Sequence, residues 1–433
     1  YNPFLWNTQL NTIGNYRIYI TFTDLKGNLL QNDDGSSLNV SASFEIKDII
    51  PPVITLLYPS NNTNFANNFS IPNLTFSVTE DLIDSCQLYG NWGTGWHENQ
   101  TLISPLANGT SVNFSGINTG TDGYYIWNVR CNDTSGNVGW KNFNFTFSTF
   151  FTPDKPLLIN ISQNKNDGTG NVTLLWNSSN HTYTYKIYQS SDLSSNFTLL
   201  GETSNLNFTD TNFSGNTRRF YRVDAFNPTS QSASLDYFGA HVYNLKHNGN
   251  TKNWIGFPTN ASYLVTANDS LNEIKNATAF TMWNATIQKR VTCNAFSCPV
   301  FPSCTDTNCN FALKQGGGYE VNINSSAPNS INWSLVGITY LQKINITLSK
   351  NSTDFGKNWI SVYANTSLSN AQSILGNIAN SDAVTNWDSQ NQISQGLIPS
   401  PFPWIPYLGT NFNIKMEKGY EVSVTQNTNW TQV

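Results

Sequence analysis

Two stretches of the chain share one spelling about a hundred residues apart. The first is KQGGGYEVNI at residues 314–323, and the second is KMEKGYEVSV at residues 415–424. Both read Lys-x-x-x-Gly-Tyr-Glu-Val. An upstream stretch repeats as well, because KNWIGFPTNAS from Lys252 returns as KNWISVYANTS from Lys357. The end of the chain therefore predicts one domain of about a hundred residues that is present twice.

Each copy of the motif predicts a strand with one face toward a core, because apolar residues alternate along it. The core-facing residues are Tyr319, Val321 and Ile323 in the first copy and Tyr420, Val422 and Val424 in the second. Glu320 and Glu421 fall on the other face, where we expect solvent rather than an acid or base site. Gly318 and Gly419 occupy positions where a turn would need positive φ.

Each copy also predicts one short helix. Its apolar side would carry Leu271 and Ile274 in the first copy, and Ile374 and Ile378 in the second. The whole unit resembles a surface repeat of secreted archaeal and bacterial proteins, which runs from a Trp-x-x-Ile-Ser start through Trp-Asp to Gly-Tyr-x-Val and Asn-Trp-Thr. Gly256 replaces the Ser and Asn284 the Asp in the first copy. The resemblance implies a scaffold.

The composition indicates an extracellular β protein. The 433 residues contain 13% aromatic and only 11% charged residues, against roughly 25% charged in an average soluble protein. Aromatic and β-branched residues favour strands. A net charge of −5 without a Lys/Arg run argues against nucleic acid as a partner. No apolar run is long enough to span a membrane.

A strand-turn-strand pattern occurs twice before residue 150. GNYRIYITFTDLKGN from Gly14 and YYIWNVRCNDTSGN from Tyr124 align through their Gly-Asn turns. Asp24 then falls on Asp133, and we expect both carboxylates to accept backbone hydrogen bonds in their turns. Phe22 falls on Cys131.

Pro-Pro-x-Ile-x-Leu from Pro51, Cys-x-Leu-Tyr from Cys86 and Val-x-Cys-x-Asp-x-x-Gly-Asn from Val129 together resemble the immunoglobulin-like repeat of archaeal surface proteins. Residues 1–48 offer too few strands for a sandwich of their own and predict a partial domain.

Residues 151–240 resemble a fibronectin type III domain. Trp176 lies on an early strand, Tyr185 and Ile187 on the next, and Tyr221, Val223 and Ala225 on a late one. The predicted fold is mostly β: a tandem array of immunoglobulin-like and fibronectin type III-like sandwiches, followed by two β-rich repeats with one short helix each. The predicted domains are 1–48, 49–150, 151–240, 241–338 and 339–433.

The six cysteines predict disulfides, as expected in an oxidising compartment. We expect Cys86 to bond Cys131 across the two sheets of the second domain. The cluster CNAFSCPVFPSCTDTNC offers four thiols that zinc could also bind, but its spacing is wider than the usual knuckles. We favour a nested pairing of Cys293 with Cys309 and Cys298 with Cys304.

Asn-x-Ser/Thr acceptor sites for N-linked glycans occur 26 times among 64 asparagines. The pattern predicts glycosylation on surface positions. The best candidates match between the two repeats or lie near turns: Asn61, Asn108, Asn132, Asn260, Asn332, Asn365 and Asn429.

An uncharged, proline-rich stretch, GLIPSPFPWIPYLG at residues 396–409, interrupts the second repeat. Proline disfavours a central strand there, so we expect a stiff apolar loop. It either folds over its own domain as a lid or projects and buries Phe402, Trp404 and Tyr407 in a neighbour.

No catalytic, metal or cofactor motif stands out. The histidines are His97, His181, His241 and His247, and none has metal-ligand spacing. Three functions stay open: a non-enzymatic structural protein of the cell surface, in a layer or filament with copies of itself or other surface proteins; an adhesin or glycan binder that uses Trp92, Trp96 and Trp404; or the accessory tail of a secreted hydrolase. The first accounts best for repeated scaffolds and abundant glycan acceptor sites.

Overall fold

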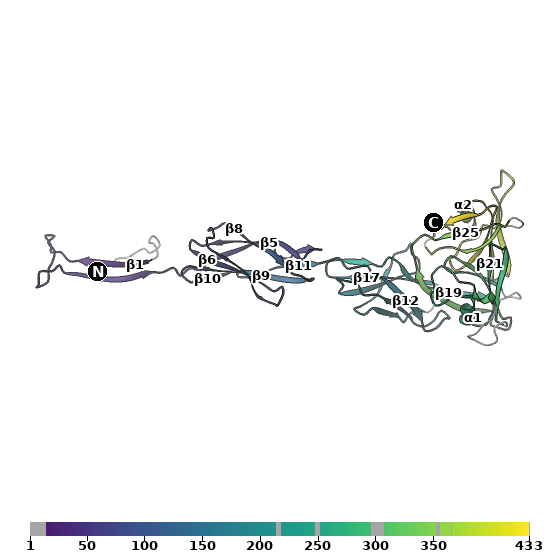
Figure 1. The fold of residues 1–433 in the computed structure, drawn as a ribbon, viewed down its shortest axis with the longest axis horizontal. Helices are drawn as coiled ribbons and strands as arrows, with labels where there is room; N and C mark the ends of the chain where they lie inside the picture. Colours follow the sequence, from purple (N-terminus) through teal and green to yellow (C-terminus); the bar gives the residue numbers. More distant parts are fainter. Residues whose placement is uncertain are drawn as a thin grey trace. The chain divides into compact units, whose positions relative to one another are not determined.

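The computed structural model describes residues 14–213, 218–246, 252–295, 307–351, 356–364 and 366–432. It is mostly β, as predicted, and the chain divides into two compact units, Tyr1–Phe151 and Thr152–Val433 (Figure 1). Each unit is described by itself. Cys298, Cys304 and Asn365 lie outside the described residues.

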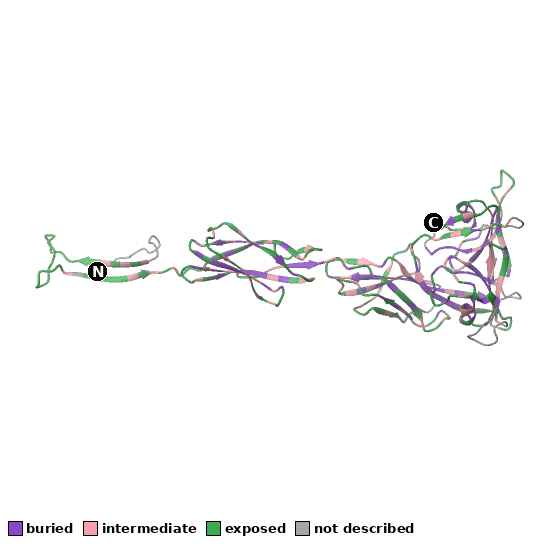
Figure 2. Cartoon of the chain, in the orientation of Figure 1, coloured by how far each residue is buried: buried purple, intermediate pink, exposed green. Residues whose placement is uncertain are grey.

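The first unit begins with a hairpin of β1 (Gly14–Thr21) and β2 (Asn39–Ile46). It forms a two-stranded sheet of its own, and the described part of the unit supplies it with no third strand. Figure 2 shows that most of its residues are exposed. Phe22, which aligns with Cys131, is 40% exposed, so it is not a core residue in the described structure. The hairpin thus has no sandwich core.

A two-sheet sandwich follows. One sheet has the order β4-β11-β9-β6-β7 and the other β3-β5-β8, while β10 pairs with β9. The strands are β3 (Val53–Tyr58), β4 (Thr63–Ala66), β5 (Ser70–Thr79), β6 (Ile83–Gly90), β7 (His97–Ile103), β8 (Ser111–Asn118), β9 (Gly123–Asp133), β10 (Val138–Trp140) and β11 (Phe145–Phe150). Large apolar side chains such as Phe76, Phe114 and Trp127 fill the space between the sheets and are fully buried.

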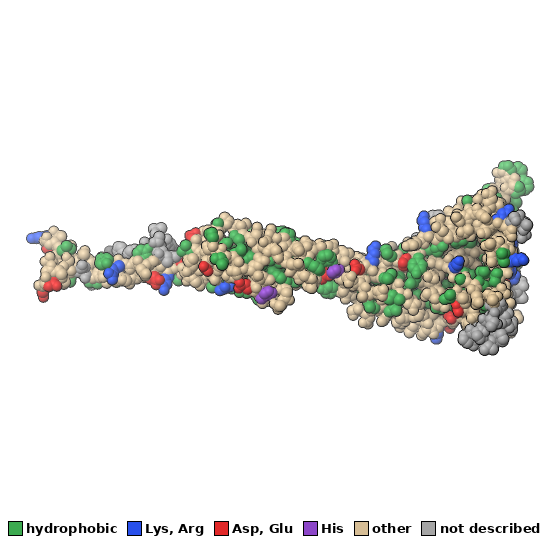
Figure 3. All heavy atoms as spheres, in the orientation of Figure 1, with side chains coloured by type: hydrophobic (Ala, Val, Ile, Leu, Met, Phe, Trp, Pro, Cys, Tyr) green, Lys and Arg blue, Asp and Glu red, His purple; other side chains and the backbone are tan. Residues whose placement is uncertain are grey.

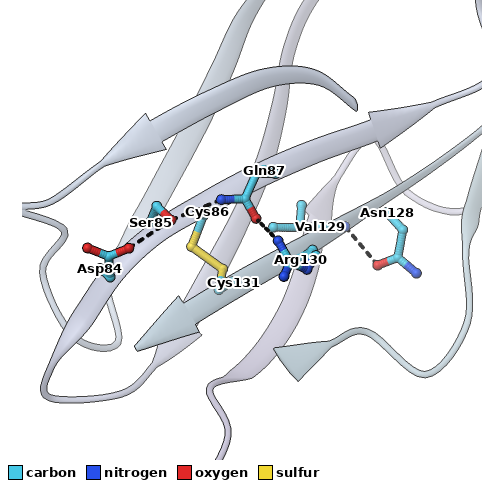
Figure 4. Close-up of a disulfide and its surroundings, with 8 residues drawn as sticks. All are labelled: Asp84, Ser85, Cys86, Gln87, Asn128, Val129, Arg130 and Cys131. Atoms are coloured by element: carbon cyan, nitrogen blue, oxygen red, sulfur yellow. Dashed lines mark hydrogen bonds between the residues drawn. A yellow bond between two sulfur atoms is a disulfide. The ribbon is translucent and has the colours of Figure 1, made fainter. Parts of the chain in front are cut away.

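The disulfide Cys86–Cys131 lies in this sandwich, but not where we expected it. β6 and β9 are neighbours in one sheet, and the two cysteines are directly opposite each other in their register (Figure 4). The bond therefore joins adjacent strands instead of linking the two sheets. Both cysteines are fully buried and belong to the core. Next to them, the side chain of Gln87 accepts a hydrogen bond from Arg130, 3.0 Å away.

The turn carboxylates behave as predicted. Asp24 Oδ1 accepts backbone hydrogen bonds from Lys26 and Asn28, both at 2.8 Å. In the equivalent turn, Asp133 Oδ1 accepts them from Ser135 at 2.9 Å and Asn137 at 2.8 Å. The duplicated Gly-Asn pattern therefore encodes one turn geometry twice.

The second unit begins with another sandwich. Its smaller sheet, of order β12-β13-β16, contains β12 (Leu158–Gln163), β13 (Val172–Trp176) and β16 (Asn207–Asp210). The larger one has the order β15-β14-β17-β19-β24, with β18 paired to β17. Its strands are β14 (Thr184–Ser190), β15 (Thr198–Thr203), β17 (Arg218–Phe226), β18 (Gln231–Ala233), β19 (Tyr237–Lys246) and β24 (Ser330–Thr339). The residues predicted for this core are buried: Trp176, Tyr185, Ile187, Tyr221, Val223 and Ala225.

Each repeat contains an antiparallel sheet with one short helix beside it. The first has the order β20-β23-β21-β22 and the second β26-β30-β27-β28-β29. The first repeat comprises β20 (Lys252–Gly256), α1 (Ala267–Glu273), β21 (Ala277–Asn284), β22 (Lys289–Asn294), the 3-10 turn η3 (Thr307–Asn310) and β23 (Gly318–Ile323). The second comprises β26 (Gly356–Ser361), α2 (Ala371–Asn377), β27 (Ser381–Asp388), β28 (Ile393–Pro399), β29 (Tyr407–Gly409) and β30 (Gly419–Val424).

The strand that follows the sheet of each repeat pairs with a strand that precedes that sheet. β24 pairs with β19, and the equivalent β31 (Thr428–Thr431) pairs with β25 (Asn345–Leu348). Positions 240/241 and 338/339, which we expected to separate domains, fall within β19 and β24. The first repeat and the preceding sandwich are therefore joined by one continuous sheet.

The predicted core faces of the repeats are confirmed. Tyr319, Val321 and Ile323 are buried in one core, and Tyr420, Val422 and Val424 in the other. The predicted helix residues Leu271, Ile274, Ile374 and Ile378 are buried in the same two cores. Cys293 bonds Cys309 and is fully buried beside the first core.

Gly318 and Gly419 serve a different purpose from the one predicted. Neither has positive φ, which in this motif occurs at Gly316 instead. A Cβ at Gly318 would lie 2.5 Å from the carbonyl oxygen of Ile360, and one at Gly419 would lie 2.7 Å from that of Ile255. Glycine is needed because the backbone of the other repeat passes directly over each position.

Candidate functional site: the paired repeats and an exposed hairpin

The two repeats contact each other through equivalent backbone hydrogen bonds. The amide of Gly256 donates to the carbonyl of Glu417 at 3.0 Å, and the amide of Ser361 donates to that of Gly316 at 2.8 Å. Gly256 and Ser361 occupy equivalent positions in the two copies, as do Gly316 and Glu417. The contact therefore has approximate two-fold symmetry. Both repeats contribute the same surface to it, as the two subunits of an isologous dimer do.

The glutamates of the motif are both hydrogen-bonded at this contact, where Glu320 is buried and the side chain of Glu421 is 16% exposed. Glu320 is 2% exposed, and Trp254 Nε1 donates to its Oε2 at 3.0 Å. In the second copy, Trp359 Nε1 donates to Glu421 Oε2 at the same distance. Our expectation was wrong because alternation shows only that these residues point away from their own core. It does not show that the partner repeat covers that face.

Cations complete both glutamate sites. Arg290 Nη1 lies 2.9 Å from Glu320 Oε1, and Lys357 Nζ lies 3.0 Å from Glu421 Oε1. A buried carboxylate is tolerated only when it is paired and hydrogen-bonded, and both conditions are met here. The arrangement binds the strands together, and each of the two glutamates has both a hydrogen-bond donor and a cation as partners.

Four tryptophans form a row across the contact. The ring centroids of Trp254 and Trp359 are 5.4 Å apart, those of Trp254 and Trp387 6.3 Å, and those of Trp283 and Trp359 6.0 Å. Tryptophans from the two copies therefore alternate in contact along the row. Such aromatic pairs add to the stability gained from area burial.

Two glutamines cross the contact reciprocally. Gln288 holds both backbone groups of Lys357, accepting from its amide at 2.9 Å and donating to its carbonyl at 3.1 Å. Gln392 holds Lys252 in the same way, at 3.2 and 3.0 Å. We missed this role, although the sequence carried a signal: glutamine ends the aligned segments after both Trp283 and Trp387.

The proline-rich stretch forms the hairpin β28–β29 at the edge of the second repeat's sheet. Trp404 is 76% exposed, Phe402 47% and Ile405 42%. The rings of Phe402 and Trp404 stack on each other, 5.5 Å apart. Figure 3 shows hydrophobic side chains gathered on a projecting tip of this unit. These residues form no lid over the core of their own domain.

Tyr407, the third residue that we expected to contact a neighbour, lies at the start of β29 and not at the tip of the hairpin. It is half-buried and packs against the core of the second repeat. No charged side chain occurs between Asp388 and Lys415. We define the apolar tip as Phe402, Trp404 and Ile405.

Aromatic residues considered for glycan binding differ in accessibility. Trp92 is 6% exposed and packs in the core of the first unit, so it cannot stack on a ligand in this structure. Trp96 is 44% exposed and lies beside Tyr89, with 6.0 Å between ring centroids.

Most of the candidate glycan acceptors are accessible. Asn61, Asn108, Asn260, Asn332 and Asn429 are exposed. Asn132 is half-buried, and its side-chain oxygen is buried.

We expect glycan occupancy to follow this accessibility. Peptide mapping of the protein purified from its native source should find glycan on Asn332 and Asn429 and the lowest occupancy at Asn132, because an enzyme must reach the side-chain nitrogen. An intact mass equal to that of the bare polypeptide would contradict the prediction.

Three carboxylates of the first unit meet near the end of the hairpin. Oxygen atoms of Asp48, Glu80 and Asp133 all lie within 4.8 Å of one another. Asp133 is engaged in its turn, and Asn137 Nδ2 donates both to Asp133 Oδ2 at 2.7 Å and to the carbonyl of Asp48 at 3.1 Å. The hydrogen bonds of Asn137 thus tie the start of the sandwich to the turn.

A partly buried polar cluster joins the second repeat to the sandwich of its own unit. His241 is fully buried, and its Nδ1 lies 3.2 Å from Glu417 Oε1. Arg218 Nη1 lies 3.3 Å from the same oxygen. Burial alone would raise the pKa of Glu417, but the hydrogen bond and charge of His241 and the charge of Arg218 outweigh it and hold that pKa below its usual 4.5.

Glu417→Gln should therefore lower stability at neutral pH. A group with a depressed folded pKa stabilises above its unfolded pKa, and this contribution disappears as pH falls through the folded value. We expect a loss of about 1–3 kcal/mol at pH 7, as for charge-assisted hydrogen bonds, and a smaller loss below pH 4.5. Thermal denaturation at both pH values measures it; equal losses at both would contradict the assignment.

No helix in the described ranges is long and apolar enough to cross a membrane. No protein-family model and no curated protein sequence matches the chain.

Several solved multidomain structures match in part. Domains A168–A170 of titin cover 51% of this chain and 86% of their own at 15% identity, with a TM-score of 0.27. The FN1–FN3 domains of chicken CNTN1 cover 47% and 70% at 12% identity, with a TM-score of 0.22. Two fibronectin type III domains of chicken tenascin cover 42% and 94% at 11% identity, with a TM-score of 0.24. All three TM-scores are low, so nothing about function follows from these matches.

Proposed function

We propose that this chain is a non-enzymatic structural component of a cell surface, a subunit of a surface layer or filament that carries N-linked glycans. The apolar tip is the observation that carries the proposal. Trp404 is exposed over three quarters of its surface in a hairpin without charge. Exposed apolar patches of this kind mark contacts with a partner.

The contact between the two repeats of the second unit supports a structural role. Its duplicated motif is used to build a buried contact between two repeats, and its glutamates are paired there with Trp254, Trp359, Arg290 and Lys357. In the described part of the chain, both of these carboxylates are engaged in a hydrogen bond and an ion pair. The glutamates that the motif repeats thus have a structural use.

Electron tomography of cells that produce the chain tests the proposal. An ordered lattice or fibre, labelled by an antibody against this chain, is the expected result. A chain found only as dispersed monomers in the medium would contradict it. A further test in vitro concerns the apolar tip and is argued in the Discussion.

A further inference from the structure

A cavity of about 290 Å³ lies in the second unit, where the sandwich and the two repeats meet. Three cationic side chains line it, Arg218, Lys415 and Lys418, with one carboxylate, that of Glu417. In a chain with only 11% charged residues and a net charge of −5, this concentration of positive charge is unusual. The cavity is near the lower size limit of small-molecule sites, about 300 Å³.

The carboxylates near the cavity are already engaged. Glu417 is held by His241 and Arg218. Asp388, which adjoins the site in sequence at Ser389, accepts hydrogen bonds from the amide of Gln390 at 3.0 Å and from Asn391 Nδ2 at 2.8 Å. Neither forms an ion pair with Lys418 or Lys415 within the described residues.

Lys418 is hydrogen-bonded through its side chain but forms no ion pair within the described residues. Its Nζ donates to Ser389 Oγ at 3.1 Å, and a hydroxyl provides no opposite charge. Burial, and then the nearby charges of Lys415 and Lys246, lower the pKa of Lys418 more than the carboxylates of Asp388 and Glu417 raise it, so its charged form is disfavoured relative to a lysine in water. An anion placed beside Nζ would favour its charged form by direct attraction.

The fold of the repeat does not require these charges. The equivalents of Glu417 and Lys418 in the first copy are Gly316 and Gly317, and the equivalent strand pairing, β20 with β23, forms there without these charges. The charges of Glu417 and Lys418 are therefore specific to the second copy, where Glu417 pairs with Arg218. A scaffold role alone leaves Lys418 unexplained.

We propose that this cavity binds the carboxylate of an acidic sugar residue. Lys415 and Lys418 would hold the carboxylate, while the remaining wall offers both apolar and polar groups to the ring, including Tyr243, Trp254 and Asn244. A few charged groups within a partly apolar wall are typical of small-ligand sites. The proposal goes beyond the structural role above, because the site binds a ligand whether or not the chain assembles.

Isothermal titration of the full chain at constant ionic strength tests the site, with D-glucuronate, D-glucose and sodium sulfate as separate probes. Glucuronate should bind and glucose should not. Sulfate should bind at least about tenfold more weakly, because it reaches the lysines but leaves the rest of the cavity empty; tenfold corresponds to about 1.4 kcal/mol. Sulfate binding as tightly as glucuronate, or no binding by glucuronate, would overturn the proposal.

Lys418→Met removes the charge and keeps much of the side-chain volume. It should weaken glucuronate binding at least tenfold and raise the melting temperature slightly, since a disfavoured charge is removed. Lys314→Gln is the matched control, because Lys314 is the exposed equivalent of Lys415 in the first repeat. An equal loss of binding in both variants would show that positive charge attracts glucuronate without a defined binding site. That result would also overturn the proposal. The titration measures ligand binding directly. Its result therefore does not depend on whether the apolar tip drives assembly.

Discussion

The double variant Phe402→Ala, Trp404→Ala should fail to assemble while it keeps the melting temperature of the unmodified chain. Both side chains are largely exposed and stack on each other rather than on the core. Their removal therefore creates no cavity. A Trp buried at the centre of a contact is worth about 2 kcal/mol or more, and about 1.4 kcal/mol is a tenfold change in affinity. We expect assembly to weaken by at least about thirtyfold.

Light scattering and negative-stain microscopy of the purified chain, over a range of concentrations, measure this effect. Leu235→Ala provides a control, because Leu235 is an apolar residue of the same unit with 64% exposure but lies outside the hairpin. That variant should assemble normally. Normal assembly of the double variant, or a large fall in its melting temperature, would show that the tip is not an assembly contact.

The parts of the fold that depend on local alternation could be read from the sequence. Tyr319 and Val321 identify a core face because residues two apart in a strand point the same way. Asp24 and Asp133 identify turns because a carboxylate two residues before a backbone amide can accept its hydrogen bond. In each case the interacting groups are close neighbours in sequence, so no knowledge of tertiary structure is needed.

The sequence-based predictions were wrong where the environment of a residue depends on another strand, sheet or repeat that packs against it. Glu320 was placed in solvent because nothing in its own strand reveals that the other repeat covers it. Cys86 and Cys131 were matched correctly, but sequence separation does not distinguish neighbouring strands of one sheet from strands of facing sheets. Gly318 was read as a turn glycine, whereas it is required by the approach of Ile360 from the other copy.

Trp254 also packs against the other repeat, and we expect its substitution to lower stability more than any other substitution in the contact. Trp254 is 8% exposed, touches two tryptophans of the other repeat and donates to Glu320. Trp254→Ala should cost about 3–5 kcal/mol, as for other buried tryptophans, because it leaves a cavity and a buried carboxylate oxygen without its donor. Trp359→Ala should cost less, because Trp359 is half-buried and the side chain of Glu421 is 16% exposed, which leaves the carboxylate access to water. Trp96→Ala, at an exposed position of the first unit, should change stability by less than about 0.5 kcal/mol.

Hydrogen exchange distinguishes loss of the contact from loss of one domain. The amides of Lys252 and Lys357 are bonded by Gln392 and Gln288 respectively, so each amide reports on a bond made by the opposite repeat. If the two repeats hold each other reciprocally, Trp254→Ala should speed exchange at both amides, although only one lies near the substitution in sequence. Faster exchange at Lys252 alone would mean that the repeats are independently stable and merely touch. Faster exchange at both would show that the duplicated sequence encodes a single cooperative contact, in which each copy supplies the surface that its partner buries.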